Sequence, residues 1–265
     1  MCELLGMSAN VPTDICFSFQ GLMQRGGGTG PHKDGWGIVF YEGKGVREFR
    51  DPTPGVDSRI AQLVQSYPIK SCYVISHIRQ ANVGRVCLEN THPFTREMWG
   101  QNWTFAHNGQ LKDSDALAVG RDLPVGATDS ERAFCWLLHE LRGHFTGVPD
   151  VDDLAEFLYP RFELLRSLGV FNCLLSNGDW MICYCTTKLQ WITRRAPFGQ
   201  AQLTDAEVEI NFAGETTPND VVTVIATQPL TSNEQWNEMG AGEMLVFVDG
   251  IKAWQRKRDS DEVNL

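Results

Sequence analysis

The stretch of sequence that decides the fold class runs from residue 130 to residue 185. Residues 130–144 read SERAFCWLLHELRGH, and residues 151–167 read VDDLAEFLYPRFELLRS. Both segments predict helices, the first because its leucines recur at helical spacing. Two segments rich in β-branched and aromatic residues follow, VFNCLLS at 170–176 and WMICYC at 180–185, and both predict strands. Helices clustered between runs of strands indicate an α+β fold rather than a doubly wound parallel sheet.

The rest of the chain supports the same class. Further helices are predicted at 14–24 and 58–65. Further strands are predicted at 3–7, 36–41, 46–50, 72–77, 103–107, 191–194, 208–212, 221–226, 244–248 and 251–255. Two antiparallel sheets packed on each other, with helices outside, would accommodate this number of strands. We expect one domain over residues 2–255 and a polar tail over 256–265, and we expect Pro160 to kink or split its helix.

Composition excludes several classes of function. The chain has 265 residues and a net charge of −10, which argues against a nucleic-acid partner. No run of about 18 apolar residues is present, so no membrane span is expected. The N-terminus does not resemble a secretory signal, and we expect a cytoplasmic protein. Gly26–Gly30 lacks the Lys-Ser/Thr of a phosphate loop, and no His-Glu-x-x-His or other ligand spacing occurs. The sequence therefore predicts neither a cofactor nor a metal.

Most of the eight cysteines are expected to be reduced, buried small hydrophobes. Cys183 and Cys185 should share one face of a strand. Cys2 is different because it follows the initiator methionine and is small enough for Met1 to be removed. Its thiol would then share a residue with a free α-amine, which titrates near ~8 and can act as a base. A cysteine at this position is also compatible with no function at all.

Three further segments carry side chains suited to catalysis. Arg79 follows a predicted strand, where its guanidinium can hold a carboxylate or form a surface ion pair. His107-Asn108-Gly109 is compatible with a tight turn, or with the two donors of an oxyanion hole. Asp129 lies at the start of a predicted helix, where it or Ser130 can serve as the N-cap, or Asp129 can contact a ligand.

Together these motifs resemble a known family. Met1-Cys2, Arg25-Gly26, Asp34-Gly-Trp-Gly37, His77-x-Arg79-x-Ala81, His107-Asn108-Gly109 and Thr128-Asp-Ser-Glu131 follow one another as in class II glutamine amidotransferases. By motif the resemblance runs from Cys2 to about Glu131, and by strand order to about residue 255. The sequence is similar to small stand-alone bacterial proteins of this class that carry no synthase domain. The resemblance implies the four-layer α-β-β-α sandwich of N-terminal nucleophile hydrolases.

The resemblance also implies residue roles. Cys2 would be the nucleophile, with its own α-amine as the base. Asn108 and Gly109 would form the oxyanion hole. Arg79 would hold the α-carboxylate of glutamine, and Asp129 would hold its α-ammonium. The Gly-rich stretch and the segment 80–94 would be mobile walls around the substrate, although Gln80 and Asn82 depart from the residues common in the family.

The expected activity is hydrolysis of the glutamine side-chain amide through a γ-glutamyl thioester. The ammonia would pass to an unknown acceptor on a partner protein, because no synthase-like segment follows. An alternative is hydrolysis of another γ-glutamyl amide, such as a peptide or a thiol-containing intermediate, which Arg79 and Asp129 would bind equally well. A non-catalytic binding or regulatory protein would instead retain Met1. A Cys–His protease is disfavoured because no paired motif is present.

Overall fold

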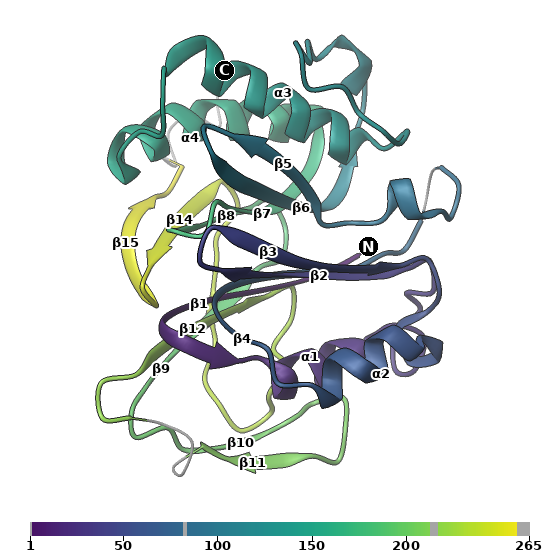
Figure 1. Ribbon diagram of the computed structural model, residues 1–265, viewed down its shortest axis with the longest axis vertical. Coiled ribbons are helices and arrows are strands. Elements are labelled where there is room, and N and C mark those ends of the chain that lie inside the picture. Colours follow the sequence, from purple (N-terminus) through teal and green to yellow (C-terminus); the bar gives the residue numbers. More distant parts are fainter. Residues whose placement is uncertain (1, 82–83, 213–216, 259–265) are drawn as a thin grey trace.

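The computed structural model describes residues 2–81, 84–212 and 217–258. In these residues the elements stack as helices, sheet, sheet and helices (Figure 1). Helices α3 (Asp129–His144) and α4 (Val151–Leu168) cover one sheet, and α1 (Cys16–Arg25) and α2 (Arg59–Ser66) cover the other. The expected α+β sandwich of two antiparallel sheets is therefore confirmed.

The first sheet contains the start of the chain. Within the described residues it has seven strands in the order β13-β9-β12-β1-β4-β2-β3. Their bounds are β1 (Glu3–Asp14), β2 (Trp36–Glu42), β3 (Gly45–Asp51), β4 (Lys70–Ile78), β9 (Gln190–Arg195), β12 (Val221–Ala226) and β13 (Asn237–Glu238). β1 lies between β12 and β4, and Glu3 pairs with Ile78. This register places Cys2 beside the residues that follow β4.

The second sheet faces the first. Its six strands in the described part of the chain have the order β15-β14-β8-β7-β6-β5. Their bounds are β5 (Phe94–Met98), β6 (Gln101–Leu111), β7 (Gly169–Ser176), β8 (Met181–Cys185), β14 (Glu243–Val248) and β15 (Ile251–Arg256). β10 (Gln200–Gln202) and β11 (Glu209–Asn211) form a separate antiparallel pair. Short turns of 3₁₀-helix occur at η1 (Gly55–Asp57), η2 (Leu88–Asn90) and η3 (Ser114–Ala116).

Two expectations about the helices are wrong, namely the N-cap of α3 and the split of α4. The N-cap of α3 is Thr128, whose hydroxyl accepts from Glu131 N–H at 3.2 Å, whereas Asp129 is the first helical residue. Thr128 stands three residues before that N–H, which is the spacing of an N-cap. α4 is continuous through Pro160, so it is not split there, and a kink stays a prediction. Pro160 and Glu156, whose carbonyl the proline leaves without its helical donor, are both exposed residues. No helix in the described ranges is both long and apolar enough to cross a membrane.

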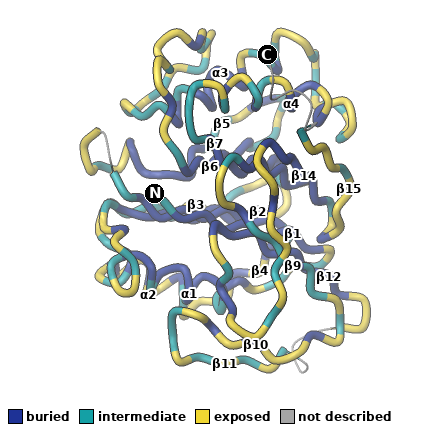
Figure 2. Tube along the Cα trace, turned by 180° about the vertical axis from the view of Figure 1, so that it is seen from behind, coloured by how far each residue is buried: buried dark blue, intermediate teal, exposed yellow. Residues whose placement is uncertain are grey.

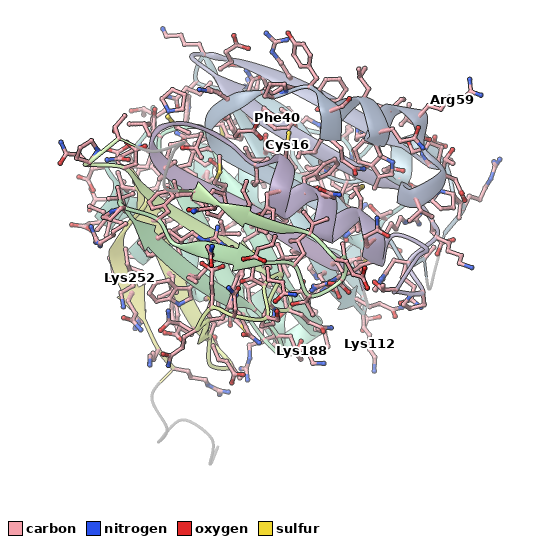
Figure 3. The ribbon with its side chains drawn as sticks, turned by 90° about the horizontal axis from the view of Figure 1, so that it is seen from below. Cys16, Phe40, Arg59, Lys112, Lys188 and Lys252 are labelled. Carbon is pink, nitrogen blue, oxygen red and sulfur yellow. The ribbon has the colours of Figure 1, made fainter. Side chains whose placement is uncertain are left out.

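Three apolar cores fill the spaces between the four layers. Phe134 of α3 packs on the second sheet, and Phe19 of α1 packs on the first. The third core lies between the two sheets and includes Leu4, Ala106 and Leu174, together with Cys183 and Cys185 of β8. Figure 2 shows the buried strands at the centre and exposed residues mainly in the outer connections. Basic side chains such as those of Arg59, Lys112, Lys188 and Lys252 project outward around the periphery (Figure 3).

Each predicted strand overlaps an observed one, but three observed strands were not predicted. β5 was missed because Phe94–Met98 carries Thr, Arg and Glu between its two buried apolar ends, a composition typical of a sheet edge. β10 and β13 are too short to show a period. The domain boundary at residue 255 stays a prediction, and most of the expected tail, residues 259–265, lies outside the described residues.

Candidate active site

Cys2 lies at the mouth of the space between the two sheets, directly before β1. Its Sγ accepts a hydrogen bond from Gln80 N–H at 3.3 Å and donates to Gln80 C=O at 3.6 Å. The side chain is half-buried, and burial raises the pKa of the Cys2 thiol. At neutral pH the sulfur is therefore a thiol, and a base is needed to make it a nucleophile.

Glu3, the neighbour of Cys2, is held by a buried arginine. Arg25, at the end of α1, pairs with Glu3 at 3.1 Å and with Asp205 at 2.7 Å. The same guanidinium donates to the carbonyls of Gln228 and Pro229 at 3.2 and 2.6 Å. The Arg25-Gly26 motif therefore fixes the beginning of β1, a role that the sequence reasoning did not assign.

Arg79 is buried, with only 4% of its surface exposed. It follows β4, and its backbone exchanges hydrogen bonds with Asp34 N–H and Gly35 C=O at 3.2 and 2.8 Å. Its guanidinium donates to Arg85 C=O at 2.9 Å. The alternative interpretation of Arg79 as an exposed surface cation is therefore wrong, and the Asp34-Gly-Trp-Gly motif holds the backbone around it.

Asn108 and Gly109 lie inside β6, opposite Asn172 and Phe171 of β7, so the interpretation as a tight turn is wrong. Gly109 is required by its surroundings, because an added Cβ would stand 1.8 Å from Val170 O. The Asn108 side chain is fully buried, and its Nδ2 is 3.4 Å from Thr227 Oγ1. Its Oδ1 has no hydrogen-bond partner among the described residues.

Asp129 is anchored to the end of β6. Its Oδ2 accepts from Leu111 N–H at 2.6 Å, and its Oδ1 accepts from Ser130 N–H at 2.9 Å. Ser130 Oγ is a third donor, 3.3 Å from Oδ1. These three bonds fix the carboxylate at the start of α3. Since a carboxylate offers about four lone pairs, roughly one remains for another donor.

Four of the five candidate residues border one cavity of about 230 Å³, namely Cys2, Arg79, Gly109 and Asp129. The other lining residues are Gln80, Ala81, His92, His107, Gln110, Thr128, Ser130 and Val170. Asn108 lies behind this lining. Two segments were expected to form walls around the substrate. Of the described residues in the segment 80–94, Gln80, Ala81 and His92 line the cavity, whereas no residue of the Gly-rich stretch does. Asn82 lies outside the described residues.

Comparison with known proteins decides the family. Residues 1–264 match the family described as "Glutamine amidotransferases class-II". The chain is 64% identical over 251 residues to the Escherichia coli (strain K12) protein named "Putative glutamine amidotransferase YafJ", covering 94% of this chain and 98% of that protein. The chain belongs to the class II glutamine amidotransferases.

Solved structures agree with this assignment. A predicted glutamine amidotransferase from Pseudomonas aeruginosa PA01 is 54% identical and superimposes with a TM-score of 0.78, covering 96% of this class II chain and all of that one. A glutamine phosphoribosylpyrophosphate amidotransferase from B. subtilis is 17% identical and superimposes with a TM-score of 0.63. The match covers 97% of this chain and 49% of that one. The second likeness concerns the fold alone, and it supports the four-layer α-β-β-α sandwich.

Three buried histidines of this class II glutamine amidotransferase lie together near Cys2: His92 and His107 line the cavity, and His77 packs against His92. The rings of His77 and His92 are 4.2 Å apart between centroids, and His107 contacts Ser130 Oγ through Nδ1 and Val170 O through Nε2 at 2.8 and 3.0 Å. Burial lowers the pKa of His77 to about 3, and it also lowers the pKa of His92 and of His107. All three imidazoles are therefore neutral near pH 7. The motifs singled out in the sequence include His77 and His107, but they indicated a role for none of the three histidines.

These histidines predict loss of stability in acid. In the unfolded chain an imidazole takes up a proton as the pH falls below about 6.5, whereas folded His77 stays neutral down to about 3. The unfolded state thus binds more protons, so the free energy of unfolding falls from pH 6.5 downward. The His77→Gln variant should lose less stability between pH 7.5 and 5.5 than the wild type, by about 1.4 kcal/mol.

Urea denaturation at the two pH values measures this difference, and each protein's own value at pH 7.5 serves as its reference. The matched control is His139→Gln, because His139 is exposed on α3. This control should keep the wild-type pH dependence. If the free energy of unfolding falls by the same amount between pH 7.5 and 5.5 in His77→Gln and in the wild type, His77 does not cause the loss of stability in acid.

Proposed function

We propose that this class II glutamine amidotransferase hydrolyses the side-chain amide of glutamine, with Cys2 as an N-terminal nucleophile exposed by removal of Met1. The observation that carries the proposal is that a thiol, a buried guanidinium, a glycine backbone and an anchored carboxylate border the same cavity. We place the reaction in the cytoplasm, and we propose that a partner protein receives the ammonia.

Recognition of glutamine requires one cation and one anion at the two ends of an amino-acid group. The planar guanidinium of Arg79 suits the α-carboxylate, which it can hold through two parallel hydrogen bonds. Asp129 suits the α-ammonium, because its carboxylate is held in place by Leu111 N–H and Ser130 and keeps about one free lone pair. Both charges border the cavity that contains Cys2.

The first chemical step forms a thioester. Because burial raises the pKa of the Cys2 thiol, the neutral α-amine of the processed residue takes the proton as Sγ attacks the amide carbon. The negative charge that develops on the amide oxygen is stabilised by Gly109 N–H and by the Asn108 amide. Collapse of this intermediate breaks the carbon–nitrogen bond, and the α-ammonium returns the proton to the leaving ammonia.

The second step releases glutamate. Water attacks the thioester carbon while the α-amine accepts its proton, and the carbon–sulfur bond breaks to return the Cys2 thiol. The cavity of about 230 Å³ is smaller than the ~300–1,000 Å³ of sites that hold drug-sized ligands. This size favours free glutamine over a larger γ-glutamyl compound.

Asn108→Ala tests the oxyanion hole. Removing one preorganised donor should lower kcat by ~10²–10³, or about 2.7–4 kcal/mol, because the charge develops only in the transition state. KM should change much less. Release of ammonia from glutamine, measured on protein whose N-terminus has been sequenced, gives both constants.

The matched control is Asn102→Ala on the same strand, where the side chain donates to Lys44 C=O at 3.0 Å and does not line the cavity. It should retain wild-type kcat. An effect of Asn108→Ala confined to KM would make this residue a ground-state binding group instead. If the wild type cleaves a γ-glutamyl peptide much faster than glutamine, the alternative substrate class is correct.

A further inference from the structure

Thr227 connects the nucleophile strand to the candidate oxyanion residue. It follows β12 directly and is almost fully buried, with 2% of its surface exposed. Its N–H donates to Leu4 C=O at 3.2 Å, and its Oγ1 accepts from Leu4 N–H at 2.9 Å. Leu4 lies two residues after Cys2, so Thr227 is attached to the strand that carries the thiol.

The same hydroxyl reaches the opposite sheet. Asn108 belongs to β6 of the second sheet, which faces β1 and β12 of the first (Figure 1). Asn108 Nδ2 is 3.4 Å from Thr227 Oγ1, which is long for a hydrogen bond. One threonine side chain therefore bridges the strand beside the nucleophile and the residue proposed to stabilise the oxyanion.

Hydrogen-bond accounting decides which end of the Asn108 amide faces Thr227. With Nδ2 toward the hydroxyl, Asn108 Oδ1 is a buried acceptor without a partner among the described residues. In the same set of residues the Thr227 hydroxyl makes no hydrogen bond as a donor. The two ends of an amide have nearly the same shape, so their contacts determine the orientation. Turning the amide by half a rotation lets the Thr227 hydroxyl donate to Oδ1, which satisfies these two groups, and it places Nδ2 in the buried position that has no partner among the described residues.

The turned amide frees a donor. Once Oδ1 accepts from Thr227, Nδ2 becomes the end of the amide that faces away from the threonine. An oxyanion hole needs N–H groups fixed in place before the charge develops, because reorientation during the reaction would consume part of their effect. An amide without this anchor can present its oxygen instead, which repels an oxyanion.

We propose that Thr227 is a positioning residue for the oxyanion hole, and that its hydroxyl donates to Asn108 Oδ1 and thereby directs Asn108 Nδ2 to the oxyanion of the substrate. The inference rests on the proposed function, in which Asn108 is an oxyanion donor. It assigns a role to a residue nearly one hundred positions beyond the family motifs, which end at Glu131.

Thr227→Val and Thr227→Ser test the role of the hydroxyl. Valine keeps the shape of threonine but cannot donate, so kcat should fall by about 10-fold or more, and by no more than the ~10²–10³ that loss of the donor itself would cause. KM should change little. Serine retains the hydroxyl and should restore kcat to nearly the wild-type value. Thr227→Ala takes the place of Thr227→Val if the valine variant does not fold.

A double-mutant cycle separates positioning from a general structural effect. If Thr227 acts through Asn108, Thr227→Val should lower kcat no further when Asn108 is already alanine. If Thr227 only supports Leu4 and Cys2, the fold-losses of kcat caused by Thr227→Val and Asn108→Ala should multiply in the double variant. Alkylation of the Cys2 thiol by iodoacetamide forms no oxyanion, so Thr227→Val should react at the wild-type rate.

The matched control is Thr223→Val on β12, the strand that Thr227 directly follows. Thr223 is fully buried, and its hydroxyl contacts Thr193 Oγ1 at 2.6 Å and Gly250 C=O at 2.8 Å, outside the cavity. It should lower the melting temperature but leave kcat unchanged. Equal impairment by Thr227→Val and Thr227→Ser, or multiplying losses in the cycle, would overturn the inference while the proposed function stands. Wild-type kcat in Asn108→Ala alone would instead remove the proposed oxyanion hole.

Discussion

Cys2→Ala is expected to abolish the release of ammonia from glutamine while leaving the protein folded. Without a sulfur nucleophile no thioester forms, and water alone is a poor nucleophile toward an amide. The cost to folding should be small, because Sγ is half-buried and its hydrogen bonds are weak ones to the backbone of Gln80. Steady-state assays and a thermal melt of the same sample measure the two effects.

The matched control is Cys16→Ala, which removes another half-buried thiol, at the start of α1 (Figure 3), and should retain activity. Mass spectrometry during turnover should detect a γ-glutamyl adduct on wild-type protein and none on Cys2→Ala. It should also show that active protein lacks Met1. Full activity in a sample that retains Met1 would contradict the role of the α-amine.

Asp129→Asn and Arg79→Gln should each weaken substrate recognition by ~2–5 kcal/mol in kcat/KM, because each leaves a charge of the bound glutamine without its partner. The wild type should strongly prefer glutamine over an analogue that lacks the α-ammonium. Asp129→Asn should erode this preference, since the analogue no longer leaves a carboxylate unpaired. Arg79→Gln should do the same for an analogue that lacks the α-carboxylate.

The matched control for Asp129→Asn is Asp150→Asn, which changes an aspartate at the start of a helix that does not line the cavity. Asp150 caps α4 by accepting from Asp153 N–H at 2.9 Å, so its substitution should reduce stability by about 1 kcal/mol or less and leave substrate preference unchanged. Unfolding free energies are measured beside the kinetics for every variant. If Asp129→Asn and Arg79→Gln both keep wild-type discrimination, these residues do not bind the two ends of the substrate.

Much of the fold was predictable because its elements have strong local signals. The helices now called α3 and α4 and the strands β7 and β8 matched their predicted bounds within one residue at either end. β1 did not, because it continues to Asp14 through a register shift between Ser8 and Thr13 that no apolar alternation indicates. Irregular pairing of this kind depends on the partner strand, which a local pattern does not contain.

The candidate site was also predictable only in part. The types of Cys2, Arg79 and Asp129 indicated the chemistry that we propose for them. The local sequence, however, favoured wrong structural interpretations for Arg79 as a surface cation and for Asp129 as a helix cap. The contacts that place Arg79 and Asp129 in the site join distant parts of the chain. The backbone of Arg79 meets Asp34 and Gly35, and Leu111 N–H meets Asp129, across separations that sequence periodicity does not reach.

The sharing of the cavity between two sheets has a mechanical consequence. Cys2 and Arg79 are carried by the first sheet, whereas Asn108, Gly109 and the anchor of Asp129 belong to the second. The core around Leu4 and Leu174 lies between the two sheets and therefore sets the distance and the alignment between them. A displacement of about 1 Å between reacting groups can cost ~10²-fold in rate. We therefore expect changes of side-chain volume in this middle layer to act on alignment as well as on folding.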